Sequence, residues 1–135
     1  MSNGANEFGV TFPQIRWIER VIRNHDNVID VKRTKDILFT IERKYGDVIE
    51  LVCIDEYTCG IIRVYEVLEY FESVNIIYVG GIWNGYTEDA KEYCLSSSVG
   101  LFNSGEIDGA LFKKKYWDFY KRDDKGNPTY PYKVA

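Results

Sequence analysis

The sequence predicts a mixed α/β domain, in which helices cover both faces of a central mixed sheet built around a β-hairpin. Two observations lead to this prediction. Residues 36–43 and 48–57 are rich in Ile, Val, Leu, Phe and Thr, and turn-forming residues 44–47 separate them, so the two runs predict a hairpin. After this hairpin, amphipathic helical patterns alternate with short apolar runs, as they do where parallel strands are joined through helices.

The individual elements follow from the spacing of apolar residues. Ile15, Ile18, Val21 and Ile22 recur at helical spacing and predict the first helix. In chain order, the predicted elements are a helix over 11–24, a strand over 27–33, the hairpin, a helix over 61–71, a strand over 73–79, a helix over 88–94, a strand over 99–102 and a helix over 105–114. The second hairpin strand, the helix over 61–71 and the strand after it form a βαβ unit, so its two strands should be parallel.

Composition and the positions of loop-forming residues divide the chain into three regions. Residues 1–10 are expected to be a flexible lead, residues 11–115 a single α/β domain, and residues 116–135 an aromatic and basic C-terminal extension. The 135 residues, 45% hydrophobic and 28% charged, suit one globular domain with a real core.

The charge and the cysteines restrict the functional classes. The net charge is −4, so nucleic acid, if it is bound, must be bound by a local basic patch and not by a global field. That patch is expected at Lys113, Lys114, Lys115, Trp117, Lys121 and Arg122. Three scattered cysteines and one histidine argue against a zinc site and indicate reduced thiols in a cytoplasmic protein. No apolar run is long enough to span a membrane, so no membrane partner is expected.

The predicted hairpin also brings carboxylates together. If Tyr45 and Gly46 are the central turn residues, then Ile41 opposes Glu50, Leu38 opposes Cys53 and Asp36 opposes Asp55. Opposed side chains share one face at a separation of ~5 Å. Two like charges so placed repel each other unless one is protonated, a cation lies between them, or water screens both.

A second candidate site is the glycine-containing loop after the strand over 73–79. Its expected ligand-contacting residues are Gly80, Gly81, Trp83 and Asn84, because ligands usually sit at the carboxyl edge of parallel strands. The spacing matches neither the dinucleotide-binding fingerprint nor the P-loop. The loop is therefore open to two interpretations, a plain strand-to-helix connection or a ligand-contacting loop.

Over about residues 12–112 the chain resembles the restriction-endonuclease-like, PD-(D/E)xK nuclease fold, and most of all its Mrr-type branch. DILFTIERKYGDVIELVCIDEY with the following helix is similar to the family's core hairpin and helix, and NIIYVGGIWNGYTEDAKEYCLSSSVGLFNSGEIDGAL resembles the Mrr-type ending. The resemblance implies a Mg-dependent nuclease, with Mn as a substitute, that hydrolyses phosphodiester bonds in DNA. Asp36 matches the family's first metal-binding acid. A nuclease would use Asp36 and Asp55 as metal ligands, Glu50 or Glu56 to assist catalysis, and the basic patch to hold the phosphate backbone.

The sequence departs from this family at its lysine. No register of VIELVCIDEY gives the acid-x-Lys pattern, and Glu42-Arg43-Lys44, which does spell it, falls at the hairpin turn. The alternative is a catalytically inactive module of the same fold that binds nucleic acid or a protein partner, with a homodimer as one open arrangement. A third interpretation makes residues 80–85 a small-molecule site in another α/β domain.

Overall fold

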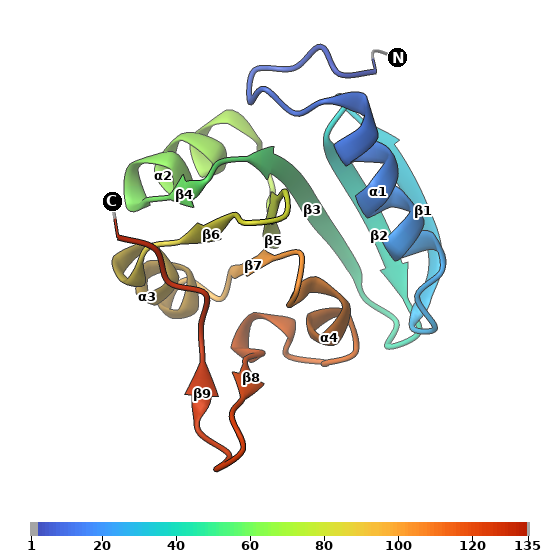
Figure 1. Cartoon of the computed structure of the whole chain (residues 1–135). Coiled ribbons are helices and arrows are strands. Elements are labelled where there is room, and N and C mark those ends of the chain that lie inside the picture. Colours follow the sequence, from blue (N-terminus) through green and yellow to red (C-terminus); the bar gives the residue numbers. More distant parts are fainter. Residues whose placement is uncertain (1–2, 135) are drawn as a thin grey trace.

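The computed structural model describes residues 3–134 as one layered arrangement of helices around a central sheet (Figure 1). The elements, in order, are α1 (Phe12–Arg23), β1 (Val28–Thr34), β2 (Leu38–Arg43), β3 (Val48–Asp55), β4 (Thr58–Cys59), α2 (Ile61–Tyr70), β5 (Ile76–Gly80), β6 (Gly85–Tyr86), α3 (Glu88–Ser96), β7 (Gly100–Asn103), α4 (Ile107–Leu111), a 3₁₀ turn (Tyr116–Asp118), β8 (Lys121–Arg122) and β9 (Pro128–Thr129). No helix among the described residues has the length and apolar character needed to cross a membrane.

The central sheet is mixed, with strand order β1-β2-β3-β5-β7. β1 to β3 are antiparallel neighbours, whereas β3, β5 and β7 run parallel to one another. The predicted hairpin is therefore the pair β2 and β3, and the predicted βαβ unit is β3, α2 and β5. Both are confirmed. β4 pairs with β6, and β8 with β9, in small sheets beside the main one.

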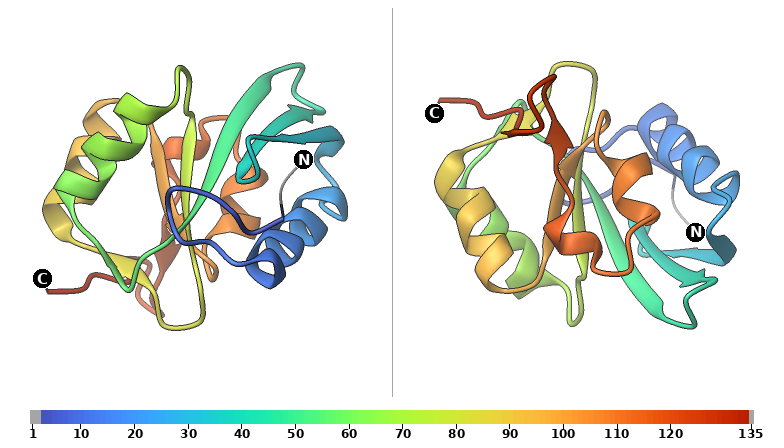
Figure 2. Two further views of the ribbon diagram at one scale, coloured as in Figure 1. Left: turned by 90° about the horizontal axis from the view of Figure 1, so that it is seen from above. Right: turned by 90° about the horizontal axis from the view of Figure 1, so that it is seen from below.

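Helices cover both faces of this sheet, as the sequence predicts. α2 and α3 lie against one face, and α1 and α4 lie against the other (Figure 2). His25 links α1 to α4, because its Nδ1 accepts a hydrogen bond from the Asn27 amide and its Nε2 lies 2.9 Å from the Asp108 carbonyl oxygen. A ring nitrogen that accepts leaves the other to donate, so this lone histidine is a packing residue between two helices.

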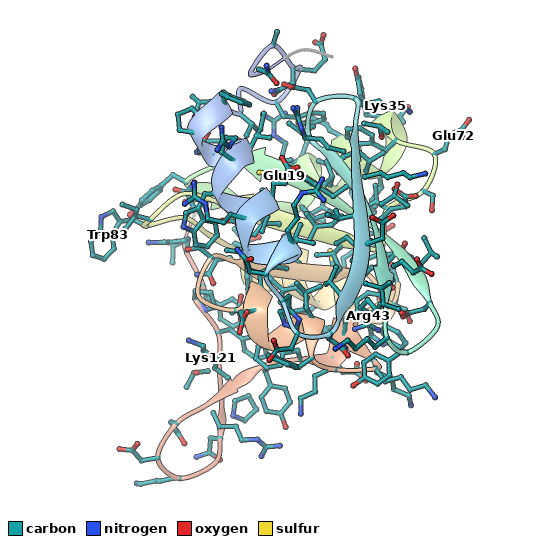
Figure 3. The ribbon with its side chains drawn as sticks, turned by 90° about the vertical axis from the view of Figure 1, so that its right-hand side faces the viewer. Glu19, Lys35, Arg43, Glu72, Trp83 and Lys121 are labelled. Carbon is teal, nitrogen blue, oxygen red and sulfur yellow. The ribbon has the colours of Figure 1, made fainter. Side chains whose placement is uncertain are left out.

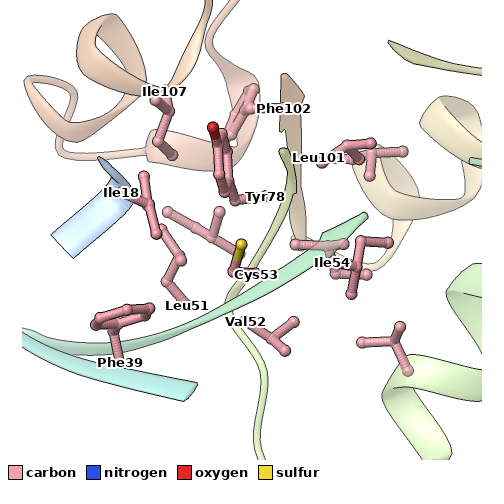
Figure 4. Packing of buried hydrophobic residues seen from close by; sticks show 14 of the residues in the cluster. Ile18, Phe39, Leu51, Val52, Cys53, Ile54, Tyr78, Leu101, Phe102 and Ile107 are labelled. Atoms are coloured by element: carbon pink, nitrogen blue, oxygen red, sulfur yellow. The ribbon is translucent and has the colours of Figure 1, made fainter. Parts of the chain in front are cut away.

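The alternation of β3 side chains divides the core into two layers. Leu51 and Cys53 face Ile18 on α1, while Val52 and Ile54 point to the opposite side (Figure 4). All four side chains are fully buried. β3 is therefore apolar on both faces, which is the pattern expected of a central strand covered by helices.

The predicted hairpin register was wrong by one residue, and Gly46 is the reason. The Arg43 amide donates to the Asp47 carbonyl (3.0 Å), and the Gly46 amide donates to the Arg43 carbonyl (3.0 Å). Gly46 has φ +89°, so the loop is a turn followed by a left-handed glycine bulge and holds one residue more than predicted.

The shift changes every pair in the hairpin. Leu38 pairs with Val52 and not with Cys53. Glu50 pairs with Thr40 and not with Ile41. The predicted opposition of Asp36 and Asp55 is likewise absent, because β2 begins only at Leu38. Asp36 and the residue before it have positive φ values, 68° and 47°, and belong to the β1–β2 turn.

Two other predicted boundaries also moved. The last helix, predicted over 105–114, covers only Ile107–Leu111. The Phe112 and Lys113 amides donate to carbonyls three residues back, at Gly109 (3.2 Å) and Ala110 (3.0 Å), so the α-helical bonding pattern ends there. In the N-terminal segment, expected to be a flexible lead, Phe8 and Val10 are buried members of the core. The core therefore extends into residues that precede the predicted domain.

Candidate functional site

Asp36, the first predicted metal ligand, is a buried structural residue whose carboxylate is fully engaged. It accepts hydrogen bonds from the Gly4 amide (3.0 and 3.2 Å), from Asn6 Nδ2 (2.8 Å) and from Arg33 Nη1 (3.1 Å). Arg33 also lies 3.8 Å from Glu19 on α1. Only 3% of Asp36 is exposed. The carboxylate thus ties the N-terminal segment to the β1–β2 turn.

The other two predicted carboxylates have different partners. Asp55 ends β3 and accepts a hydrogen bond from Asn84 Nδ2 at 3.0 Å. Glu50 lies within β3 and accepts from Thr40 Oγ1 at 2.9 and 3.1 Å. Residues five apart in a strand point to opposite faces, so Glu50 and Asp55 are on different sides of the sheet. The three carboxylates are not brought together.

These residues do not fit the Mg or Mn ion that the family resemblance implies. A divalent cation needs free oxygen ligands, and each oxygen of Asp36 already accepts a hydrogen bond, one of them from a guanidinium whose charge would repel the metal. In residues 3–134, no cluster of three or more His, Cys, Asp or Glu side chains could hold a metal ion.

Asp36→Asn is expected to lower the free energy of unfolding by about 1–3 kcal/mol, because the Asn amide nitrogen would face hydrogen-bond donors and the pair with Arg33 would be lost. Urea denaturation measures this, with the exposed Asp30→Asn as the matched control, expected to change stability by less than about 0.5 kcal/mol. Added Mg should leave both unfolding midpoints unchanged. A Mg-dependent rise in the parent that Asp36→Asn abolishes would instead establish a metal site.

The basic patch, in contrast, is built on a rigid support provided by Arg43. This side chain is fully buried, and its guanidinium donates to the carbonyl oxygens of Leu111 (3.1 Å), Lys113 (2.7 Å) and Lys114 (3.1 Å). Asp47 holds the same guanidinium from the other side through two bonds of 3.0 and 2.7 Å. One cation from the hairpin therefore fixes the backbone that follows α4.

Two more side chains complete this support. Tyr45 donates its hydroxyl to the Phe112 carbonyl at 2.6 Å, and Asn27 Nδ2 donates to the Leu111 carbonyl at 3.0 Å. The carbonyls of residues 111–114 are thus all bound by groups of the domain. Lys113, Lys114 and Lys115 are exposed. Figure 3 shows Arg43 at the end of the hairpin strands, beside α4.

A groove of about 280 Å³ lies along this segment. Its lining residues come from one stretch of chain and combine cations with aromatic rings, namely Lys113, Lys114, Lys115, Asp118, Phe119, Tyr120 and Arg122. We call this surface the basic groove. Among the other predicted contacts, Trp117 is half-buried and packs edge-on against Tyr116, with ring centroids 5.1 Å apart. Lys121 lines a neighbouring cavity with Asn103 and Glu106.

Charge is distributed unequally between the two helical layers. α1 carries three arginines and one glutamate, and residues 113–122 beside α4 carry five cations and one aspartate. On the opposite face, α2 and α3 carry five acidic side chains and two cations, the half-buried Arg63 and the buried Lys91. Cations therefore predominate around α1 and residues 113–122, although the net charge of the whole chain is negative. The net charge alone does not reveal this distribution.

The predicted ligand loop borders a second cavity, of about 330 Å³, between α1 and the β5–β6 connection. Of the predicted residues, Gly81 lines it, whereas Asn84 holds the loop closed by donating to Asp55 and to the Gly80 carbonyl. Trp83 is 76% exposed and projects from the molecule (Figure 3). The cavity's aromatic walls, Trp17 and Tyr78, come from α1 and β5.

Sequence reasoning missed both of those walls. Tyr78 lay within a run predicted to be a fully buried strand, and Trp17 interrupts the charged face of a helix beside its apolar stripe. A large aromatic residue at such a helix position was the available signal.

Comparison of the chain with protein-family models, with curated proteins and with solved structures found no match. The resemblance to nucleases of the restriction-endonuclease type therefore stays a prediction. The basic groove and the cavity beside α1 are the two candidate binding sites of the described residues.

Proposed function

We propose that this protein is a non-catalytic module that binds DNA through the phosphate backbone, using the basic groove. The observation that carries the proposal is the buried Arg43, which fixes the backbone of residues 111–114 from within. The three lysines that follow α4 are exposed together on this fixed turn. Such preorganisation matters because less conformational entropy is lost when the lysines meet a ligand.

Electrostatics supports a polyanionic ligand. Three adjacent lysines, with Arg122 in the same groove, repel one another in the free protein, and closely spaced phosphates relieve that repulsion. Neutralising phosphates also releases condensed counterions, which drives binding and makes it salt-dependent. The acidic side chains of α2 and α3 would be repelled by the same ligand. The charge distribution therefore favours one orientation of the protein on DNA, with this face directed away from it.

The contacts of Asp36 favour this binding module over a metal-dependent nuclease. Hydrolysis of a phosphodiester needs a metal or an equivalent charge to neutralise the phosphate and activate water. Asp36 instead pairs with a guanidinium and with the N-terminal segment. The nuclease activity, its Mg cofactor and the roles of Asp55 and Glu50 stay predictions, as do the homodimer and the cytoplasmic location.

Fluorescence anisotropy with a labelled DNA duplex, at low salt and without metal, tests the proposal. Changing Lys113, Lys114 and Lys115 together to Gln should weaken binding at least about tenfold, because each lysine contributes a phosphate contact. The matched control removes three cations elsewhere, the exposed Lys32 and Lys35 and the half-buried Lys133, and should bind within about twofold of the parent. Absence of binding by the parent, or an equal loss in the control, would contradict the proposal. Incubation of the parent with DNA and Mg or Mn should give no cleavage.

A further inference from the structure

We propose that the cavity between α1 and the β5–β6 loop accepts one unstacked base of single-stranded nucleic acid. This inference rests on the proposed function, because it adds a base-binding subsite to a phosphate-binding surface. It would give the protein a preference for unpaired strands that the basic groove alone does not provide.

The cavity offers a flat aromatic wall. The rings of Trp17 and Tyr78 are nearly parallel, with an interplanar angle of 15° and centroids 6.1 Å apart, so they overlap only in part. Trp17 is 41% exposed, while Tyr78 lines the cavity with only 2% of its surface exposed. A base can therefore stack on the open part of the indole. The volume of about 330 Å³ is that of a small ligand pocket.

Polar groups stand at the rim of this otherwise apolar cavity. Ser104 Oγ donates to the Gly81 carbonyl at 3.2 Å, and the hydroxyl oxygen can still accept a hydrogen bond. Gln14 uses its Oε1 to accept from the Thr11 amide (2.9 Å) and also lines the cavity. Its Nε2 group is a donor suited to a base edge. A flat apolar wall with a few donors and acceptors suits a base better than a charged metabolite.

Cations lie near the cavity on two sides, and this charge complementarity favours part of a polyanion as its occupant. On α1, Arg16 and Arg20 border a neighbouring hollow of the same helix. On the other side, Lys121 lies next to Gly105, which directly follows the rim residue Ser104. Figure 3 shows Lys121 and the exposed Trp83 along one side of the molecule. A strand held in the basic groove can therefore pass Lys121 and place a base at Trp17, with its phosphates near arginines.

The test compares two ligands and two variants of Trp17 in the full-length chain. Trp17→Leu keeps an apolar side chain on Tyr78 but removes the stacking surface, whereas Trp17→Phe keeps an aromatic ring. Stacking on an aromatic side chain contributes a factor of between about 5 and 150 in affinity per base. We expect Trp17→Leu to lose an amount in this range for an oligo(dT) strand and less than about twofold for a duplex. Trp17→Phe should keep most of the affinity.

An oligonucleotide with abasic sites separates stacking from a general folding defect. Abasic sites should weaken binding to the parent and have little further effect on Trp17→Leu. Equal losses on single strand and duplex, or no loss on either, would overturn the base pocket while leaving phosphate binding in place. If the parent binds neither ligand, the proposed function itself fails, and the cavity would then suit an apolar side chain of a protein partner.

Discussion

Replacing Arg43 with methionine is expected to lower the free energy of unfolding by about 3–5 kcal/mol. Methionine fills similar volume but donates no hydrogen bonds, so the carbonyls of Leu111, Lys113 and Lys114 lose a buried donor. Asp47 also loses its partner. Leaving buried carbonyl groups without their hydrogen-bond donor is among the most destabilising effects of single substitutions.

Guanidinium chloride unfolding of the parent and Arg43→Met measures this effect. The exposed Arg23→Met, which breaks a surface pair with Glu19, is the matched control and should cost no more than about 1 kcal/mol. Where Arg43→Met is still folded, hydrogen exchange should show faster opening of residues 112–116, and DNA affinity should fall although no lysine has changed. A stability within 1 kcal/mol of the parent would show that the turn after α4 does not depend on Arg43.

Glu106→Ala is expected to have an effect of similar size, about 3–5 kcal/mol at neutral pH. Glu106 is 2% exposed, and its carboxylate accepts the Tyr86 hydroxyl (2.9 Å to each oxygen) and the Asn103 amide (3.1 Å). Burial raises the pKa of this carboxyl, and the nearby Lys91 ammonium counteracts the shift. Alanine would leave a buried hydroxyl without its acceptor and a buried ammonium without its counter-charge.

Thermal and urea unfolding of two further variants tests that account. Glu106→Gln keeps an oxygen acceptor for Tyr86 and should lose about half as much stability as Glu106→Ala. Glu92→Ala, an exposed acid on α3, should change stability by less than about 0.5 kcal/mol. If Glu106→Ala and Glu92→Ala behaved alike, Glu106 would have no structural role in joining β6, β7 and α4.

Lys91, which lies near Glu106, should make the free energy of unfolding depend on pH. Its ammonium is fully buried, donates to the Leu101 carbonyl at 2.8 Å and lies 4.3 Å from the Phe102 ring centroid. Burial lowers the pKa of Lys91 from 10.5 to about 8. At pH values between about 8 and 10.5, the unfolded chain binds more protons at Lys91 than the native protein does. The free energy of unfolding should therefore gain about 1.4 kcal/mol per pH unit from this group in that window.

The difference between the parent and Lys91→Met isolates this contribution. Cys59 and Cys94 act in the opposite direction, because burial raises the pKa of each thiol to about 12, but both thiols are present in both proteins. The unfolding free energy of the parent should rise relative to Lys91→Met from pH 8 to pH 10. Parallel curves would mean that Lys91 titrates alike in the folded and unfolded chains.

The local signals in the sequence were sufficient for the four α-helices and the strands of the central sheet, because each depends on neighbours in the chain. The short strands β4, β6, β8 and β9 were not predicted. Helical spacing of Ile15, Ile18 and Ile22 located α1, and the apolar run before Gly80 located β5. The predicted register of the hairpin was wrong because one glycine at positive φ adds a residue to the turn. Successive side chains in a strand point to opposite faces, so a shift of one residue moves each predicted partner to the other face of the sheet.

The candidate sites depend on contacts between distant residues, which composition and spacing do not encode. Asp36 was predicted as a metal ligand from the hairpin register and from the family resemblance. Its carboxylate instead binds Gly4 and Asn6, some 30 positions away in the chain. The basic patch was predicted from its lysines, whereas its support, Arg43, lies about 70 residues away and looked like part of an ordinary turn. The cavity beside α1 exists only once Trp17 and Tyr78 pack together.

The most direct test of DNA binding by the basic groove is the salt dependence of duplex affinity. The logarithm of the binding constant should fall linearly with the logarithm of salt concentration, with a slope set by the number of phosphates neutralised. Exchanging Lys113, Lys114 and Lys115 for Gln should make that slope shallower by about 2–3, whereas the control triple at Lys32, Lys35 and Lys133 should leave it unchanged. An unchanged slope in the groove variant, or no salt-dependent binding by the parent, would contradict the proposal.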